Sequence, residues 1–358
     1  MITKKKSACS LLLLLLIHVL VASTGVINGE TINPAALVPS TTKLEYHGGP
    51  LLTGPPAVNV YLLWYGSFSP QHKLAVSDFF ASFHSATPGS VSAWWRTVEA
   101  YRDARRAPVS GTVSLAAQAS DPGCSLGKTL RRAHVASLAR DAIAKKRLFP
   151  LDDDGGLYLV LTAPDVAVER FCMSSCGFHD SVAVSGRKVV FGHVGDPAAQ
   201  CPGLCAWPYA VPTYGPPGAV PLVAPNGVGV DGMVMNVAAV LAGSATNPFG
   251  NGYFQGDALA PLEAATACAG MFGDGAYPGY PGKLMTDPRT RASFNVYGAR
   301  GRRFLLPAMW DPLSLTCKKR LPVYQYHESE LKSLLPRAEG RNIFSKTGAT
   351  ALCFGSGR

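Results

Sequence analysis

The segment AVNVYLLWYG, residues 57–66, decides the fold class of this chain. Its aromatic and β-branched residues, followed by a glycine, are typical of a buried strand. Two later segments have the same character: GLYLVLTA at residues 156–163 and KVVFGHV at residues 188–194. Helical patterns lie between these strands, and this alternation predicts a mixed α/β fold arranged in layers.

Apolar spacing places further elements around the first strand. Ser69 and Pro70 open a predicted helix that ends near residue 84, and a second helix starts near Ser90. A strand is expected at residues 109–116. A longer helix with a basic face is expected at residues 128–146.

The second half of the chain has a different texture. Residues 201–226 are rich in proline and read as loop, a helix is expected at residues 230–243, and an apolar segment follows at residues 303–312. No internal repeat or polar linker divides the chain. We therefore expect one layered domain with long ordered loops over residues 30–317, followed by a mobile tail at residues 318–358.

The first 29 residues have the pattern of a secretory signal peptide. Three lysines precede an apolar run at residues 11–22, and small residues follow, so cleavage is expected between Ala22 and Gly29. The run is short for a membrane span, which needs about 20 apolar residues. No later segment reads as a span, which predicts a protein released to the extracellular space.

The net positive charge of the chain favours an acidic partner. Loss of the three leader lysines lowers the formal charge from +10 to +7. A mildly basic extracellular protein is attracted to acidic polysaccharide, such as the pectin of a plant wall. The basic residues are scattered and the compartment is wrong for nucleic acid, so we expect no nucleic-acid partner.

Cysteine usage fits the same compartment. One of the nine cysteines lies in the leader. Seven of the others are disulfide candidates: Cys124, Cys172, Cys176, Cys201, Cys205, Cys268 and Cys317. The eighth, Cys353, lies in the tail, and eight cysteines allow 105 pairings, so connectivity stays open. The cysteine pairs near His179 and His193 have a spacing that zinc could also use, but an oxidising compartment favours disulfides.

The stretch DGMVMNVAAVLAGSATNPFGNGYF, residues 231–254, has the outline of an active-site helix without reactive side chains. No Gly-x-Ser-x-Gly elbow of a serine hydrolase occurs in the chain. The acidic run at residues 152–154 is contiguous, whereas calcium loops alternate their ligands, so we interpret it as a solvated turn.

Eight collinear segments carry a resemblance to a known family. They are YHGGPLLTG, VNVYLLWYG, DPGCSLGKTL, FCMSSCGFH, QCPGLCAWP, LVAPNGVGVDGMVMN, SATNPFGNGYFQG and AYPGYPG. With these segments, about residues 42–317 resemble the plant EXORDIUM family of phosphate-induced extracellular proteins. The resemblance implies secretion to the apoplast and a part in brassinosteroid-responsive cell expansion and carbon-dependent growth, and no enzymatic activity is established for that family. It implies a cell-wall polysaccharide or a receptor protein as partner.

A second resemblance bears on the fold and on catalysis. Residues 230–254 are similar in outline to secreted microbial zinc peptidases, whose helix carries His-Glu-x-x-Glu. The matching positions here are Ala239, Val240 and Gly243, none of which binds a metal or moves a proton. This suggests a degenerate zinc-peptidase-like frame without catalytic residue, metal or cofactor. The side chains left for a residual site are His179, His193, Asp231 and Glu263.

Aromatic residues beside proline and glycine are the candidates for partner binding. They are Trp207, Tyr209, Tyr277 and Tyr280. Such rings can stack on sugars, or they can pack rigid loops. The sequence leaves both interpretations open.

Overall fold

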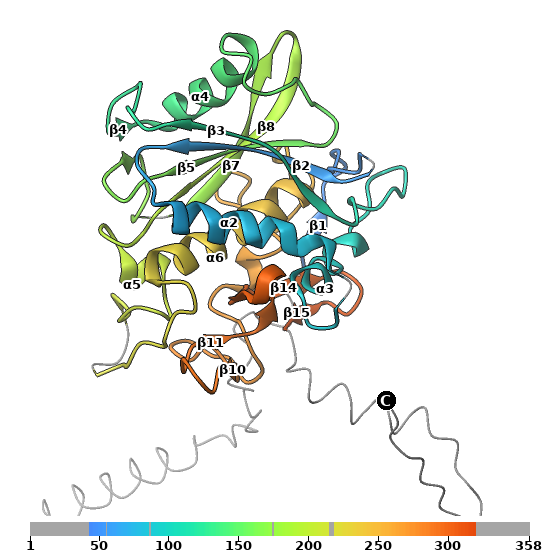
Figure 1. The fold of residues 1–358 in the computed structure, drawn as a ribbon. Coiled ribbons are helices and arrows are strands. Elements are labelled where there is room, and N and C mark those ends of the chain that lie inside the picture. The colour runs from blue at the N-terminus through green and yellow to red at the C-terminus, as the bar shows by residue number, and fades with distance from the viewer. Residues whose placement is uncertain (1–42, 55, 86, 174, 215–217, 320–358) are drawn as a thin grey trace, which may run out of the picture.

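The computed structural model describes residues 43–319, apart from residues 55, 86, 174 and 215–217. The predicted signal peptide, the predicted tail from residue 320 onward and Cys353 lie outside the described residues. The described part is a mixed α/β structure, as the alternation of strands and helices predicts (Figure 1).

A five-stranded sheet forms the centre of the molecule, with the strand order β3-β2-β5-β8-β7. Its strands are β2 (Val58–Tyr65), β3 (Val113–Asp121), β5 (Gly156–Thr162), β7 (Gly177–Val184) and β8 (Arg187–Gly195). The neighbours from β3 to β8 are parallel, and β7 pairs antiparallel with β8. Strand β5 is buried along its whole length, whereas the edge strands β3 and β7 are partly exposed. This is the burial expected of a parallel sheet covered on both faces.

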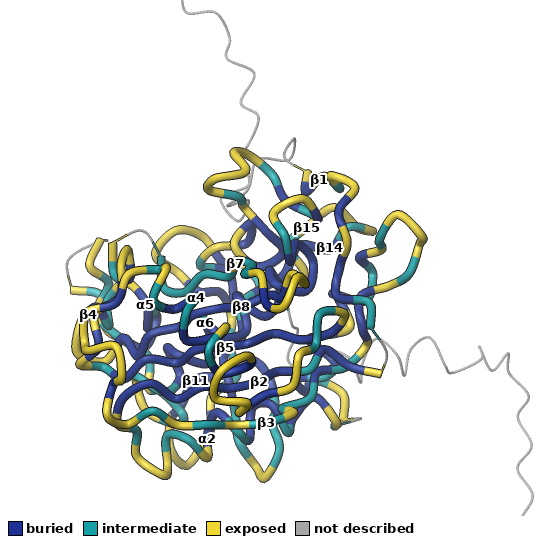
Figure 2. The backbone as a smooth tube through the Cα atoms, turned by 90° about the horizontal axis from the view of Figure 1, so that it is seen from above, coloured by how far each residue is buried: buried dark blue, intermediate teal, exposed yellow. Residues whose placement is uncertain are grey.

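Helices cover the two faces of this sheet. Helix α4 (Arg132–Ala144) packs on one face, and α2 (Pro70–Ala81) and α6 (Val228–Thr246) pack on the other (Figure 1). Side chains alternate along each strand, so β5 supplies Leu159 to the core beside α6 and Val160 to the core beside α4. Figure 2 shows the buried backbone concentrated in the sheet and in α6, with exposed residues in the loops around them.

Short elements make up the rest of the described chain. The paired short strands are β1 (Glu45–Tyr46) with β9 (Tyr253–Phe254), β4 (Thr129–Leu130) with β6 (Ala167–Val168), β10 (Met285–Thr286) with β11 (Ser293–Phe294), β12 (Val296–Tyr297) with β13 (Arg303–Phe304), and β14 (Met309–Asp311) with β15 (Thr316–Lys318). The short helices are η1 (Ser82–His84), α3 (Val91–Trp95), η2 (Val98–Ala100), α5 (Pro202–Cys205), η3 (Thr266–Cys268) and η4 (Ala299–Gly301).

Several predicted boundaries were wrong, each for a local reason. The strand expected at residues 109–116 begins later, because the backbone N–H groups of Val109 and Ser110 donate to Tyr101 and Leu52 instead of joining the sheet. The helix expected from residue 128 begins at residue 132, because the residues before it pair as β4. Strand β7 was not predicted.

Helix α6 extends beyond the expected residues 230–243 at both ends. It ends at Thr246, where Asn247 leaves the helical conformation and Pro248 follows. In length and composition α6 could cross a membrane, so the expectation that no later segment reads as a span was too strict. Most of this helix is buried inside the fold, and it is therefore a core helix.

Candidate functional site

Two of the four residual-site residues meet, although 84 positions separate them in sequence. His179 lies on β7, and its Nε2 atom is 2.9 Å from each carboxylate oxygen of Glu263. Asn247, just past the end of α6, donates from Nδ2 to the Oε1 atom of Glu263 at 2.7 Å. The side chains of His179 and Glu263 are only 10% and 11% exposed. The result is a nearly buried His-Glu-Asn cluster.

Helix α6 passes directly beside this cluster. A Cβ atom added to Gly243 would overlap the carboxylate of Glu263 and press on the ring of His179. Gly243 occupies the position of the last glutamate in the peptidase pattern. Because glycine has no side chain, it leaves the space that Glu263 fills. Only glycine lets α6 approach the pair this closely.

The cluster holds an ion pair. Burial acts to lower the pKa of His179, but the negative charge of Glu263 and the hydrogen bond to it outweigh that effect, and Asp180 adds to it. The net result is a raised pKa, which favours the imidazolium form. The Nδ1 atom of His179 is buried and has no hydrogen-bond partner among the described residues.

His193 lies on the opposite face of the sheet. In the β7–β8 register His179 is opposite Gly192, while His193 is opposite Phe178. The Nε2 atom of His193 is 2.9 Å from the Oγ1 atom of Thr162, and burial together with the charge of Arg132 lowers its pKa to about 3. The two histidines point to different sides and cannot share a ligand.

Asp231 is also remote from the cluster. It lies in the first turn of α6, twelve positions before Gly243, which is roughly 18 Å along the helix. Its carboxylate accepts hydrogen bonds from the backbone N and from Nδ2 of Asn226, at 2.7 and 2.8 Å. Burial raises the pKa of Asp231 to about 7, against the opposing effect of these bonds. Within the described residues, no three His, Cys, Asp or Glu side chains are placed to hold a metal ion.

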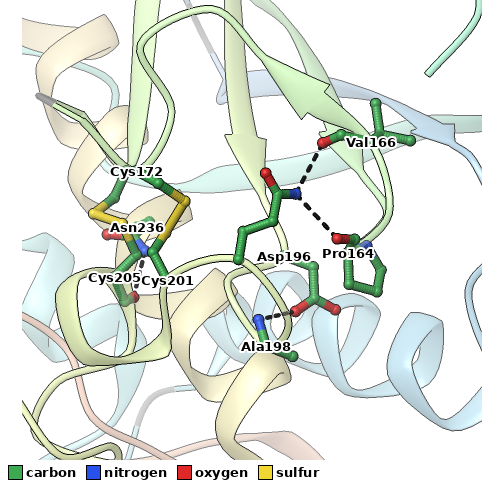
Figure 3. The surroundings of a disulfide bond; sticks show 10 residues. Pro164, Val166, Cys172, Asp196, Ala198, Cys201, Cys205 and Asn236 are labelled. Atoms are coloured by element: carbon green, nitrogen blue, oxygen red, sulfur yellow. Dashed lines mark hydrogen bonds between the residues drawn. A yellow bond between two sulfur atoms is a disulfide. The ribbon is translucent and has the colours of Figure 1, made fainter. Parts of the chain in front are cut away.

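Six of the seven candidate cysteines form disulfides, which confirms that prediction for them. The bonds are Cys172–Cys201, Cys176–Cys205 and Cys268–Cys317. The first two join the segment before β7 to α5, where Asn236 of α6 also donates to the carbonyl oxygen of Cys205 (Figure 3). The cysteine spacing that zinc could use therefore belongs to disulfides. Cys124 is buried and has no disulfide partner among the described residues.

The candidate aromatic residues divide into two groups. Tyr209 is 2% exposed and donates from its hydroxyl to the carbonyl oxygen of Ser293, so this ring packs a loop, the second of the two interpretations that the sequence left open. Trp207 packs on Phe272, with ring centroids 6.0 Å apart. The other pair stays accessible: Tyr277 and Tyr280 are 46% and 39% exposed, with rings 5.2 Å apart.

A groove of about 710 Å³ lies where β2 and β5 begin. Its lining includes the acidic run at residues 152–154, which was expected to be a solvated turn. The carboxylate of Asp152 instead accepts hydrogen bonds from Asn59 and Tyr61, and that of Asp153 from Arg187. The first two carboxylates of the run therefore fix the corner before β5.

Comparison with known proteins identifies the family. A family model described as "Phosphate-induced protein 1 conserved region" matches residues 44–320. Protein PHOSPHATE-INDUCED 1 of Nicotiana tabacum is 46% identical over 289 residues, which cover 78% of this chain and 88% of that protein. Protein EXORDIUM of Arabidopsis thaliana is 46% identical over 290 residues, 76% of this chain and 88% of that protein.

Protein EXORDIUM-like 6 of Arabidopsis thaliana is more distant, at 30% identity over 298 residues, 73% of this chain and 87% of that protein. No solved structure matches this chain. The molecule is thus a disulfide-bonded mixed α/β protein with a buried His-Glu pair. The chain belongs to the phosphate-induced protein 1, or EXORDIUM, family, as its sequence motifs predict.

Sequence reasoning did not assign Asn247 to the site. Asn247 was not a candidate, although its Nδ2 donates to Glu263 and its Oδ1 accepts from the backbone N of Gly252. The available signal was an asparagine directly after a buried helix, a position where its amide can serve both neighbours.

Proposed function

We propose that this protein is a secreted, non-catalytic regulator of plant growth that acts in the apoplast by binding a cell-wall polysaccharide or a receptor protein. The family resemblance supports a part in brassinosteroid-responsive cell expansion and carbon-dependent growth. The predicted signal peptide and the three disulfides support an oxidising extracellular compartment. The net positive charge supports contact with acidic wall polymers.

One observation carries the non-catalytic part of the proposal. The acid and base that lie against Gly243 near the end of α6, Glu263 and His179, bind each other, and Asn247 donates to a further lone pair of the carboxylate. A general base must reach the proton that it removes, and a metal ligand must direct a lone pair at the metal. Here the Nε2 atom of His179 and both carboxylate oxygens of Glu263 are engaged inside the protein, and the other ring nitrogen of His179, Nδ1, is buried.

The alternative is a hydrolase on a metallopeptidase-like scaffold with altered residues. The observation in its favour is that Gly243, at a ligand position of the peptidase pattern, lies against Glu263 and His179. A frame of that kind would place a metal where the ion pair now lies. The pair fills this space, so binding is the better-supported function.

Two variants separate the functions. We expect Glu263→Gln and His179→Gln to keep the growth activity in plants that lack the native protein, since neither side chain is proposed to touch a partner. Both variants should be less heat-stable, because each breaks the buried ion pair. Loss of growth activity in variants that remain folded by circular dichroism would favour the hydrolase instead. So would near-stoichiometric zinc in the untagged secreted protein, measured by elemental mass spectrometry.

A further inference from the structure

A second concavity, of about 380 Å³, lies where α2 meets the segment around η4, and three arginines line it. We call it the arginine pocket. Its charged and polar lining consists of Asp78, Asn226, Thr290, Arg300, Arg302 and Arg303, and its apolar lining includes Leu74, Pro225 and Ala292. The volume lies in the range of small-molecule sites, which is about 300–1,000 Å³.

A buried carboxylate fixes two of these guanidinium groups. Asp78 on α2 is 1% exposed, and it accepts from Arg300 through Oδ1 and from Arg302 through Oδ2, the latter at 3.0 Å. The third, Arg303, pairs with buried Asp287 and lies over the ring of Phe294, 5.2 Å from its centroid. Side chains held in this way lose little further freedom when a ligand binds.

Asp231 holds Asn226, one of the residues that line the arginine pocket, in place. It binds both the backbone N and the Nδ2 atom of Asn226, and the Oδ1 atom of Asn226 accepts from the Nη1 atom of Arg302 at 2.9 Å. Asn226 also donates to the carbonyl oxygen of Arg303. Asp231, a residual-site candidate in the sequence, is therefore a positioning residue for this arginine cluster.

The backbone conformation at Arg300 is unfavourable for any residue that has a side chain. Its φ is 53°, in the left-handed region, where a residue other than glycine is disfavoured by about 1–2 kcal/mol. The turn is nonetheless fixed on α2, because the backbone N of Ala299 donates to the hydroxyl of Ser82 at 2.7 Å. In this conformation the guanidinium of Arg300 reaches the buried carboxylate of Asp78.

Charge determines what the arginine pocket attracts. Three guanidinium groups line it, against the carboxylate of Asp78 in the lining and that of Asp287, which pairs with Arg303, and Arg289 and Arg291 are exposed on either side of Thr290. Each guanidinium has five N–H donors, so the bonds to Asp78, Asn226 and Asp287 leave most donors without a partner among the described residues. Such donors match the two oxygens of a carboxylate.

We propose that the arginine pocket binds an oligosaccharide that carries carboxylate groups, an oligouronate. The guanidinium groups bind the carboxylate, and Leu74, Pro225 and Ala292 contact the apolar face of the sugar ring. The apolar lining is the reason to assign a sugar acid rather than free inorganic phosphate, which has no apolar face. This inference rests on the proposed function, because it supplies the site through which the protein would hold an acidic wall polymer.

The test compares three single variants of the mature secreted protein by titration calorimetry against oligogalacturonate. Arg302→Gln and Arg300→Gln change the arginine pocket, and Arg140→Gln is the control, an exposed arginine on α4 at the other face of the sheet. Losing one charged hydrogen-bonding group should weaken binding about tenfold to hundredfold. The control should stay within about twofold of the parent protein, and added salt should weaken binding by the parent.

The Arg300→Gln variant should remain folded, because buried Asp78 keeps its bond to Arg302 in that variant. A loss of affinity in this variant therefore reports on the pocket and not on misfolding. Unchanged oligogalacturonate affinity in both pocket variants would overturn the proposal. So would full competition by a neutral galactan oligomer, or by inorganic phosphate at equal concentration, since either would show that the ligand is not a sugar acid. If the pocket variants and the parent bind isolated wall polymer equally, only the site assignment fails. If the parent binds no wall polymer, wall binding itself fails.

Discussion

The five-stranded sheet and the region from residue 220 to residue 318 satisfy their buried backbone in different ways. In the sheet, backbone groups bond to one another along ladders of six to eight residue pairs. In the later region the strands are two or three residues long, and buried side chains make many of the bonds. Asn295 alone donates to the carbonyl oxygens of Phe272 and Leu306 and accepts from the N–H of Leu306. Outside α6, buried polar side chains therefore satisfy backbone groups in the later region that strand ladders satisfy in the sheet, while apolar residues of both regions share one core.

The largest effect is expected from the disulfide that closes the later region. Replacing both Cys268 and Cys317 by Ala should lower the free energy of unfolding by about 4 kcal/mol, because the bond closes a loop with a sequence separation of 49. Removing Cys172 and Cys201 in the same way should cost about 1 kcal/mol or less, since Cys176–Cys205 still closes nearly the same loop. Guanidinium unfolding measures both, and equal losses would contradict the difference.

A smaller effect is expected from a single amide. Asn295→Ala leaves three buried backbone groups without partners, which should lower the free energy of unfolding by about 3 kcal/mol. This matches the loss expected for Leu161→Ala in the sheet, about 3 kcal/mol. Asn251→Ala is the control at an exposed asparagine and should change stability by less than about 0.5 kcal/mol. A loss for Asn295→Ala as small as that of the control would show that the comparison is wrong.

The dependence of the free energy of unfolding on pH distinguishes a histidine inside the sheet from one that joins the two regions. The folded pKa of His193 is lowered to about 3, so the unfolded chain binds one more proton between pH 3 and about 6.5. The free energy of unfolding should fall by about 1.4 kcal/mol for each unit of acidification in that window. Replacing His193 by Gln should remove this dependence.

His179 should show the opposite sign. Its folded pKa is raised, so its contribution is fully present below the unfolded pKa of about 6.5 and is lost as the pH rises through the folded pKa. Unfolding measured over a pH series should therefore show the difference between parent and His179→Gln shrinking toward alkaline pH. Slopes of the same sign for both histidine variants would refute the assignment of the two side chains to different environments.

The sheet could largely be predicted from the sequence, because continuous apolar runs such as residues 57–66 report burial on both faces. Strand β7 escaped prediction because its segment GFHDSVAV is half exposed and mixes polar with apolar residues, as an edge strand does. The later region escaped because its order depends on side-chain amides such as those of half-buried Asn226 and buried Asn295, which in a sequence look like loop residues.

The candidate site was only partly accessible from sequence for a related reason. Spacing along the chain named His179, His193, Asp231 and Glu263 together, but strand register decides which face each histidine occupies. A slip of one residue in β7 would turn His179 to the face of the sheet that His193 occupies. The arginine pocket was beyond reach, since the segment that carries Arg300 and Arg302 lies more than 220 positions from Asp78. Only the folded chain joins them.

The paired bonds between α5 and the segment before β7 have a consequence for reduction kinetics. Both bonds span 29 positions, and their cysteines are four residues apart on each side. When the thiolate of a reductant attacks one bond, it forms a mixed disulfide with one cysteine and frees the thiol of the other. The intact bond holds that thiol nearby, so it attacks the mixed disulfide and expels the reductant before a second reductant molecule completes the reduction. Lasting release of the segment requires both bonds to be open at once. The reducing power needed therefore rises more steeply than for a single bridge, and brief reductive pulses leave the connection intact.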